Sequence, residues 1–176
     1  MANVLTQGIL HCDSLGIVAT GPVWVKAINF IAAATQTFTL RWWDEKTPAV
    51  SKRGITYTVT TSTDDTVTST GNFTSAWADG KVAKCLKTTG SDSGVYGLIQ
   101  TAGNDNAFVT HLSPFTTEAD KVGDWDCYTS YVAVIGKQPE DTNEESKWMT
   151  FGGRGFRFPN LALDVLDGGT VTIYVA

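Results

Sequence analysis

Residues 161–175 read LALDVLDGGTVTIYV, and this stretch decides the fold class. Its centre, Asp-Gly-Gly at 167–169, supplies the positive φ angles that a tight turn needs. After the turn, Val171, Ile173 and Val175 alternate with threonine and tyrosine, which places the three aliphatic side chains on one buried face. The stretch therefore predicts an antiparallel β-hairpin.

A second pair of strand-like runs stands nearer the start of the sequence. Residues 23–31 (VWVKAINFI) are apolar on both faces, which is typical of a central strand. Residues 37–43 (TFTLRWW) alternate, with Phe38, Leu40 and Trp42 on one face. Because the connection between the two runs is short, we expect them to form another antiparallel hairpin.

Similar short runs, separated by turn signals, continue along the chain. Threonine, which favours strands, is the commonest residue with 26 copies, and no long segment has helical periodicity. We expect about eight to ten short strands, with a buried strand at 127–135 and an exposed acidic loop at 136–146. The pattern predicts an all-β fold, an antiparallel β-sandwich or jelly roll. We expect a single domain over residues 1–176, in which residues 1–20 form an N-terminal arm or an edge strand.

Composition and charge exclude several classes of protein. Only 18% of the 176 residues are charged, the net charge is −5, and the 13 basic residues are scattered. Nucleic-acid binding is therefore not expected, because it normally requires a basic stripe. No apolar run approaches the roughly 20 residues of a membrane-spanning helix, so no membrane partner is expected. The sequence starts without the basic and apolar segments of a secretory signal, which predicts folding in the cytoplasm.

The residues that carry most enzyme chemistry are few and scattered. Cys12, Cys85 and Cys127 are far apart and odd in number, which predicts buried free thiols. His11 and His111 are too few to supply the ligands of a metalloenzyme, and no G-x-S-x-G motif is present. We therefore predict that the protein is not an enzyme and has no catalytic residues, metal or cofactor. A hydrolase in which His111 meets an acid and a serine is the remaining alternative.

Two short motifs could bind ions. Residues 120–126 contain three aspartates that could offer oxygen atoms to Ca²⁺, but they lack the EF-hand order, and a solvated turn is favoured. Residues 152–158 (GGRGFRF) could form an anion-binding nest, but a glycine-rich turn leading into an edge strand is favoured. In that turn Arg154 and Arg157 could contact an acidic neighbour.

Six tryptophans stand out in a chain of this composition. Trp24 and Trp42 lie on the predicted core faces of their strands, whereas Trp43 lies on the opposite face from Trp42. Tryptophans in or beside loops serve as protein–protein hot spots, as platforms for a sugar ring, or as packing beneath the loops. The predicted interface candidates are Trp43, Trp77, Trp125, Trp148, Arg154 and Arg157.

The runs at 23–30 and 161–175 together resemble small all-β virion proteins of tailed bacteriophages. Those proteins often end in a leucine-rich strand, a glycine turn and a strand containing valine, isoleucine and tyrosine. The resemblance implies a β-sandwich or jelly-roll protein of the virion, and the capsid decoration (cement) class fits the size best. It provides no catalytic residues to carry over.

The resemblance and the composition together predict a non-enzymatic decoration protein located on the virion and assembled in the host cytoplasm. Its expected partners are the major capsid protein and further copies of itself, because such a protein bridges neighbouring subunits of a shell. Strand faces rich in threonine carry little charge to keep other surfaces away, which suits such packing. The alternative is a carbohydrate-binding β-sandwich, either a separate module or the receptor-binding part of a tail fibre.

Overall fold

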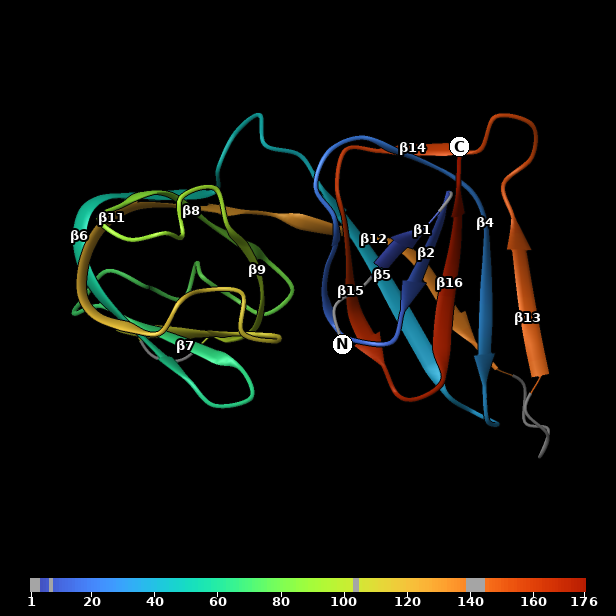
Figure 1. The fold of residues 1–176 in the computed structure, drawn as a ribbon, viewed down its shortest axis with the longest axis horizontal. Coiled ribbons are helices and arrows are strands. Elements are labelled where there is room, and N and C mark those ends of the chain that lie inside the picture. Colours follow the sequence, from blue (N-terminus) through green and yellow to red (C-terminus); the bar gives the residue numbers. More distant parts are fainter. Residues whose placement is uncertain (1–3, 7, 103–104, 139–144) are drawn as a thin grey trace. The chain divides into compact units, whose positions relative to one another are not determined.

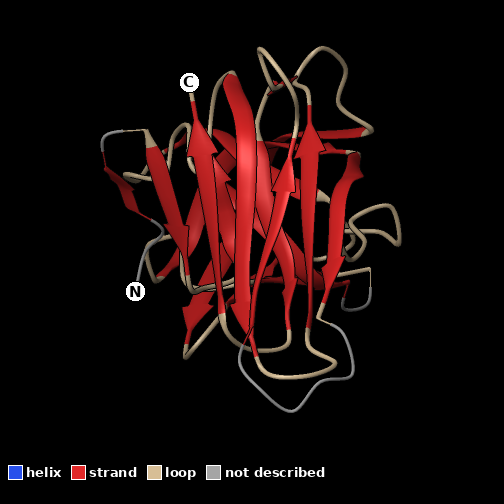
Figure 2. Ribbon diagram, turned by 90° about the vertical axis from the view of Figure 1, so that its right-hand side faces the viewer, coloured by secondary structure: helices blue, strands red, loops and turns tan. Residues whose placement is uncertain are grey.

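The computed structural model describes residues 4–6, 8–102, 105–138 and 145–176. These residues form sixteen β-strands and no helix, so none of their segments is a helix able to span a membrane. Figure 2 shows strands and loops only, with long strands running side by side. The described strand pairs are antiparallel, which confirms the all-β prediction. There are more strands than the eight to ten expected, because several have only three or four residues.

The chain divides into two compact units, although the sequence predicted one domain. The first, which we call the sheet unit, combines Met1–Trp43 with Tyr131–Ala176. The second, the barrel unit, is Asp44–Ser130, and it is therefore inserted between two strands of the first (Figure 1). The resemblance to virion proteins involves only residues of the sheet unit. The predicted buried strand at 127–135 crosses this boundary and is interrupted at Thr129. The prediction is wrong for its second half, because Tyr131, Val132 and Ile135 are exposed.

The sheet unit is built from two antiparallel sheets. The first has the order β1 (Val4–Thr6), β2 (Ile9–Cys12), β16 (Thr170–Val175), β4 (Val23–Ala32) and β13 (Glu145–Thr150), and β14 (Phe156–Phe158) also pairs with β4. The second has the order β12 (Ser130–Lys137), β5 (Thr37–Trp43), β15 (Leu161–Leu166) and β3 (Gly16–Ala19). In the described part of residues 1–20, β1 and β3 are edge strands, as the second of the two alternatives predicted, and β2 lies between β1 and β16.

One hydrophobic core joins the two sheets. It is formed by alternate residues of β4 and β16 from the first sheet and of β5 and β15 from the second. The rings of Phe30 and Phe38 meet edge to face across this core, with centroids 4.8 Å apart. Val171 and Ile173 are fully buried in it and Val175 packs against it, which confirms the buried face that alternation predicted.

The two predicted hairpins are wrong, because neither pair of strands is hydrogen-bonded together. β4 lies in the first sheet and β5 in the second, and the same holds for β16 and β15. Each pair is therefore a β-arch, in which the turn carries the chain from one sheet to the other. The two arches stack, since β16 pairs with β4 and β15 pairs with β5.

The turns of the two arches fit closely together. The backbone N–H of Asp167 donates to the carbonyl of Thr37 at 3.0 Å, and the Asp167 carboxylate accepts from the N–H of Thr37 at 3.2 Å. Gly169 has a φ of +79°, and a Cβ atom there would lie 2.1 Å from the carbonyl oxygen of Ile31. The glycine therefore allows the left-handed turn and also the close approach of the neighbouring arch.

The barrel unit is a closed ring of six strands. Their order is β10 (Ala107–Thr110), β7 (Asp65–Thr68), β6 (Val50–Thr61), β11 (Glu118–Tyr128), β8 (Val82–Thr88) and β9 (Tyr96–Ala102), and β9 pairs with β10 to close the ring. Residues 120–126 form part of β11, so the prediction of a solvated turn there is wrong.

Aromatic side chains fill the interior of the barrel. Trp125 lies among them, with ring centroids 5.0 Å from Tyr57, 5.0 Å from Phe115 and 5.7 Å from Phe108. Most of these contacts are edge to face, the geometry that the quadrupoles of aromatic rings favour. The barrel is therefore closed around side chains.

The three cysteines are free and buried, as the sequence predicted. Burial raises the pKa of Cys12 and Cys127 to about 12 and that of Cys85 to about 11, because the thiolate loses its hydration. We expect no reaction with a thiol reagent at pH 8 in the native protein and three labelled cysteines in urea, measured by mass spectrometry. Rapid native labelling would contradict this. Cys12 reports on the sheet unit, and Cys85 and Cys127 report on the barrel unit.

Candidate functional site

The outward side of the first sheet carries three cross-strand rows of side chains. Tyr174, Ala27 and Thr150 are aligned across β16, β4 and β13, the next row holds Thr172, Asn29 and Trp148, and the third row holds Thr170, Ile31 and Ser146. Paired residues of an antiparallel sheet point to the same face, so these rows and their neighbours on β2 form one surface. We call it the neutral face. Its residues are Ile9, His11, Ala27, Asn29, Ile31, Ser146, Trp148, Thr150, Thr170, Thr172 and Tyr174.

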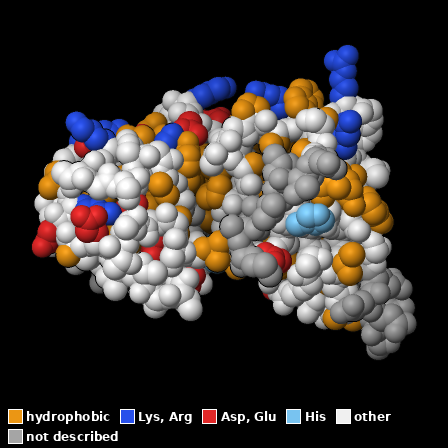
Figure 3. Space-filling view, in the orientation of Figure 1, with side chains coloured by type: hydrophobic (Ala, Val, Ile, Leu, Met, Phe, Trp, Pro, Cys, Tyr) orange, Lys and Arg blue, Asp and Glu red, His pale blue; other side chains and the backbone are white. Residues whose placement is uncertain are grey.

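The neutral face contains no aspartate, glutamate, lysine or arginine among its eleven residues. In the view of Figure 3 the lysine and arginine side chains lie mainly along the upper edge, and most of the other described surface is backbone, uncharged polar or hydrophobic. Charged side chains are mostly exposed in folded proteins, and they are depleted at the centres of protein interfaces. The neutral face therefore shares its lack of charged side chains with the centres of protein interfaces.

Exposed rings stand on the neutral face. The side chain of Trp148 is 53% exposed, and its ring lies over Tyr174 with centroids 5.2 Å apart. Several polar neighbours bond to each other, since the Ser146 hydroxyl donates to Asn29 Oδ1 at 2.6 Å. These bonds occupy polar groups within the face, and the rings and the exposed Ile31 present apolar area.

Basic groups lie beside the neutral face on the same sheet. Arg157 is opposite Trp24 in the pairing of β14 with β4, and both side chains are exposed. A pocket of about 400 Å³ is lined by Trp24, Lys26, Gly153, Arg154 and Ala176. This border could receive an acidic group of a partner, as the sequence suggested for the two arginines.

A second apolar surface lies on the edge strand of the other sheet. β12 ends the order β12-β5-β15-β3, and its Tyr131, Val132 and Ile135 side chains are exposed. The Tyr131 ring contacts Trp42, with centroids 5.0 Å apart. Exposed apolar edge strands offer a template for pairing with another chain.

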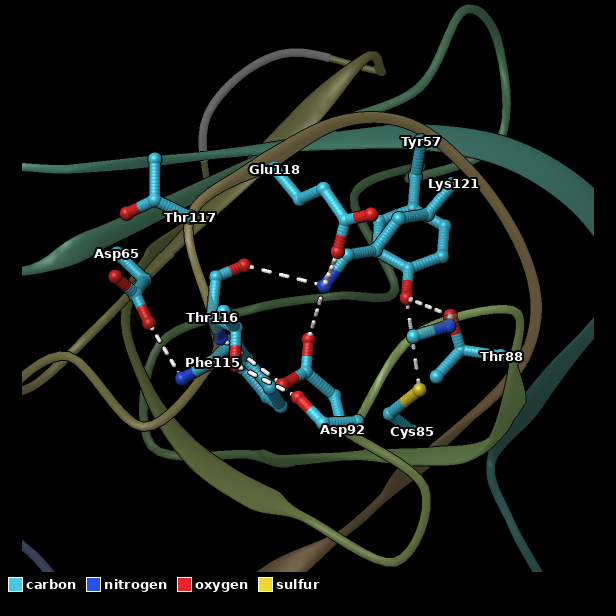
Figure 4. A network of polar contacts seen from close by, with 12 residues as sticks. Tyr57, Asp65, Cys85, Thr88, Asp92, Phe115, Thr116, Thr117, Glu118 and Lys121 are labelled. Atoms are coloured by element: carbon cyan, nitrogen blue, oxygen red, sulfur yellow. Dashed lines mark hydrogen bonds and ion pairs between the residues drawn. The ribbon is translucent and has the colours of Figure 1, made fainter.

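In the barrel unit, a lysine side chain is turned into the interior (Figure 4). Asp120 has a φ of +54°, and the pairing of β11 with β6 is shifted at this point. This irregularity directs Lys121 inward, where its ammonium nitrogen lies 2.9 Å from Asp92 Oδ2 and 2.9 Å from Glu118 Oε2. It also donates to the carbonyl of Thr116 at 3.3 Å. We call these four residues the Lys121 network.

The two charges of the central ion pair are withdrawn from water. The side chain of Lys121 is 0% exposed and that of Asp92 is 2% exposed, whereas Glu118 is 53% exposed. Burial alone lowers the pKa of Lys121, but hydrogen bonds to Asp92 and Glu118 outweigh it, and the net shift is upward. Burial alone raises the pKa of Asp92, but hydrogen bonds from Lys121 and Thr116 leave it lowered. The resting pair is therefore ionised.

Asp92 is held at both carboxylate oxygens. Oδ2 faces Lys121, and Oδ1 accepts the backbone N–H of Thr116 at 2.9 Å. The segment before Asp92 also lies close, because a Cβ atom on Gly90 would be 3.0 Å from Lys121 Nζ. The geometry of the ion pair is therefore fixed from several sides. The sequence does not reveal this pair, because the acidic composition of residues 120–126 is that of a solvated turn.

The predicted interface residues fall into two groups, one buried and one exposed. Trp43, Trp77 and Trp125 are fully buried and cannot present a surface. Trp148, Arg154 and Arg157 are exposed in the sheet unit, where their interface role stays a prediction. Trp24 is 40% exposed, so its assignment to the core is wrong.

The three aspartates of residues 120–126 do not form a metal site. The Asp124 carboxylate accepts the N–H of Gly54 at 2.7 Å, and Asp126 pairs with Arg53 at 2.7 Å. Among the residues that the structure describes, no group of three histidine, cysteine, aspartate or glutamate side chains is placed to hold a metal ion.

Comparison with known proteins found no match among protein-family models, curated proteins or solved structures.

Proposed function

We propose that the protein is a non-enzymatic structural protein of a phage virion, of the capsid decoration class, and that the neutral face binds the capsid shell. The observation that carries the proposal is the absence of charge from eleven outward residues that include an exposed Trp148–Tyr174 stack. Binding there buries aromatic and aliphatic area and desolvates no charged group on this side of the contact.

The scaffold supports this role. We propose that the two sheets around one core form a β-sandwich. Such a scaffold is rigid enough to present a flat surface. The basic border with Arg154 and Arg157 orients the partner on the neutral face. Charge complementarity at the rim of an interface fixes the register of the two proteins more than it raises their affinity. The exposed edge of β12 supports the proposed contact with further copies of the chain.

Trp148→Ala is expected to weaken binding to shells of the major capsid protein encoded by the same genome. Truncating a tryptophan that becomes buried in an interface costs about 2 kcal/mol, or roughly a 30-fold rise in Kd. Co-sedimentation of the purified protein with shells measures this. Val122→Ala is the control, since it truncates an exposed apolar side chain of the barrel unit, outside the neutral face and the β12 edge, and should leave shell binding unchanged. Failure of the unaltered protein to co-sediment, together with its absence from purified particles, would refute the proposal.

Carbohydrate binding is the second candidate, and one observation favours it. The Trp148–Tyr174 stack lies beside the Asn29 amide and the Ser146 hydroxyl, so apolar and polar groups that recognise a sugar adjoin each other. Trp77 and Trp125, the other two tryptophans in or beside predicted loops, are buried and cannot serve as platforms for a sugar ring. A glycan array on which the unaltered protein binds and Trp148→Ala does not would favour this function over shell binding.

A further inference from the structure

We propose that the Lys121 network forms a covalent cross-link, an isopeptide bond between Lys121 Nζ and Asp92 Cγ. This inference is independent of the proposed virion role. It starts from the distances, since the nitrogen lies 2.9 Å from Asp92 Oδ2 within the barrel. Two reacting groups held in contact react as if at very high local concentration.

Burial makes the neutral, reactive form of the pair accessible, although the hydrogen bonds keep the pair ionised at rest. The ammonium and the carboxylate are ionised at rest, but neither has access to bulk water. Transfer of one proton from Lys121 to Asp92 gives a neutral amine beside a neutral carboxylic acid, which a low-dielectric site tolerates better than it tolerates isolated charges. The lone pair of the amine then lies next to the carboxyl carbon.

The remaining members of the network match the needs of the step. The amine attacks Cγ, and the negative charge that develops on Oδ1 is stabilised by the N–H of Thr116, which already donates to that oxygen at 2.9 Å. The Glu118 carboxylate, 2.9 Å from the nitrogen, accepts a proton from it and returns the proton to the leaving Oδ2.

Atoms balance without any further reactant. The C–N bond forms, the bond from Cγ to Oδ2 breaks, and the ammonium and the carboxylate together lose one molecule of water. No oxidation occurs. Glu118 ends in its starting state, and its 53% exposed side chain gives the water a route to solvent. The product ties β11 to the loop before β9 across 29 positions of sequence.

A comparison within the same unit indicates which features matter. Lys84 also pairs with a carboxylate, that of Glu45, but both side chains are partly exposed. Glu45 has the Tyr96 hydroxyl as a further donor, and no backbone N–H is aimed at it in the described hydrogen bonds. The Lys84–Glu45 pair is therefore the internal control for a lysine ion pair that stays non-covalent.

Tryptic mapping of the full chain tests the proposal. Residues 88–121 contain no arginine and no lysine before Lys121, and the next lysine is Lys137. The cross-link blocks cleavage after Lys121, so we expect a single product of residues 88–137 that is lighter by one water. Lys121→Arg keeps the charge but removes the nucleophile, and it should give separate peptides 88–121 and 122–137 of full mass. Glu118→Gln should leave most molecules unlinked, and Lys84→Arg should not change the linkage.

The result that overturns the proposal is equally defined. Purified protein, incubated for days at neutral pH, would be cut after Lys121 and would give peptides of full linear mass. A succinimide at Asp92 also loses water but leaves the cut after Lys121 open, and that outcome overturns the proposal too. Shielding of Cys85 and Cys127 in each variant shows that its barrel has folded, so a variant that fails to fold is not counted.

Discussion

Trp125→Ala is expected to destabilise the barrel unit strongly and to leave the stability of the sheet unit unchanged. The indole contacts the rings of Tyr57, Phe73, Phe108 and Phe115, so its removal leaves a cavity within a closed ring of strands. Loss of a buried tryptophan costs about 3–5 kcal/mol of unfolding free energy, which is a large part of the roughly 5–15 kcal/mol that stabilises a typical domain. Few single substitutions in the chain should cost more.

Thiol labelling in increasing urea locates the effect. In Trp125→Ala, Cys85 and Cys127 should react at lower urea than in the unaltered protein, and Cys12 should react at unchanged urea. The indole Nε1 of Trp125 makes no hydrogen bond with the described residues, so Trp125→Phe should restore much of the loss. Trp24→Ala, at a partly exposed position, should change stability by about 0.5 kcal/mol or less. Equal shifts for all three cysteines would contradict separate unfolding of the two units.

Trp125 also shows why part of the candidate site was misjudged from sequence. Its neighbours are Asp124 and Asp126, and an aspartate pair around a tryptophan looks like a solvated turn. In the structure the three residues alternate along β11, and the two carboxylates bond to Gly54 and Arg53 of the adjacent strand. Strand alternation was the available signal, but the acidic composition was given more weight.

The strands themselves were more predictable than their partners. Alternation at Val171 and Ile173 follows from local sequence, because one face of a strand must be buried wherever it pairs. Whether a turn joins a hairpin or an arch depends on which surface each strand meets, and that is a long-range property. Phe30 and Phe38 meet across the core, and nothing in the short segment between them encodes that meeting.

The Lys121 network could not have been predicted from residue spacing. Its central contact joins residues 29 positions apart, and the inward direction of Lys121 depends on the left-handed conformation of Asp120. A non-glycine residue in that conformation is uncommon and marks a site where the surrounding structure imposes the geometry. By contrast, the glycines of 152–158 correctly indicated a turn before an edge strand, β14.

Gly169→Ala is expected to destabilise the sheet unit. The size of the loss in unfolding free energy distinguishes an arch from a hairpin. In a simple hairpin turn, alanine at a φ of +79° would cost about 1–2 kcal/mol from backbone conformation alone. In the stacked arches the new methyl group would also meet the Ile31 carbonyl oxygen at 2.1 Å and Ala32 Cβ at 2.6 Å. Overpacking of this kind adds about 1–3 kcal/mol, which gives roughly 2–5 kcal/mol in total.

Gly153→Ala is the matched control for this prediction. Gly153 also has a positive φ, +34°, but a Cβ atom there has no neighbour within 4 Å, so only the conformational cost applies. Urea unfolding followed through Cys12 should therefore show a clearly larger loss for Gly169→Ala than for Gly153→Ala, with Cys85 and Cys127 unaffected. If the two alanine variants were equally stable, the close contact between the turns would not contribute to the free energy of unfolding. The hydrophobic core alone would then stabilise the stacking of β15–β16 on β4–β5.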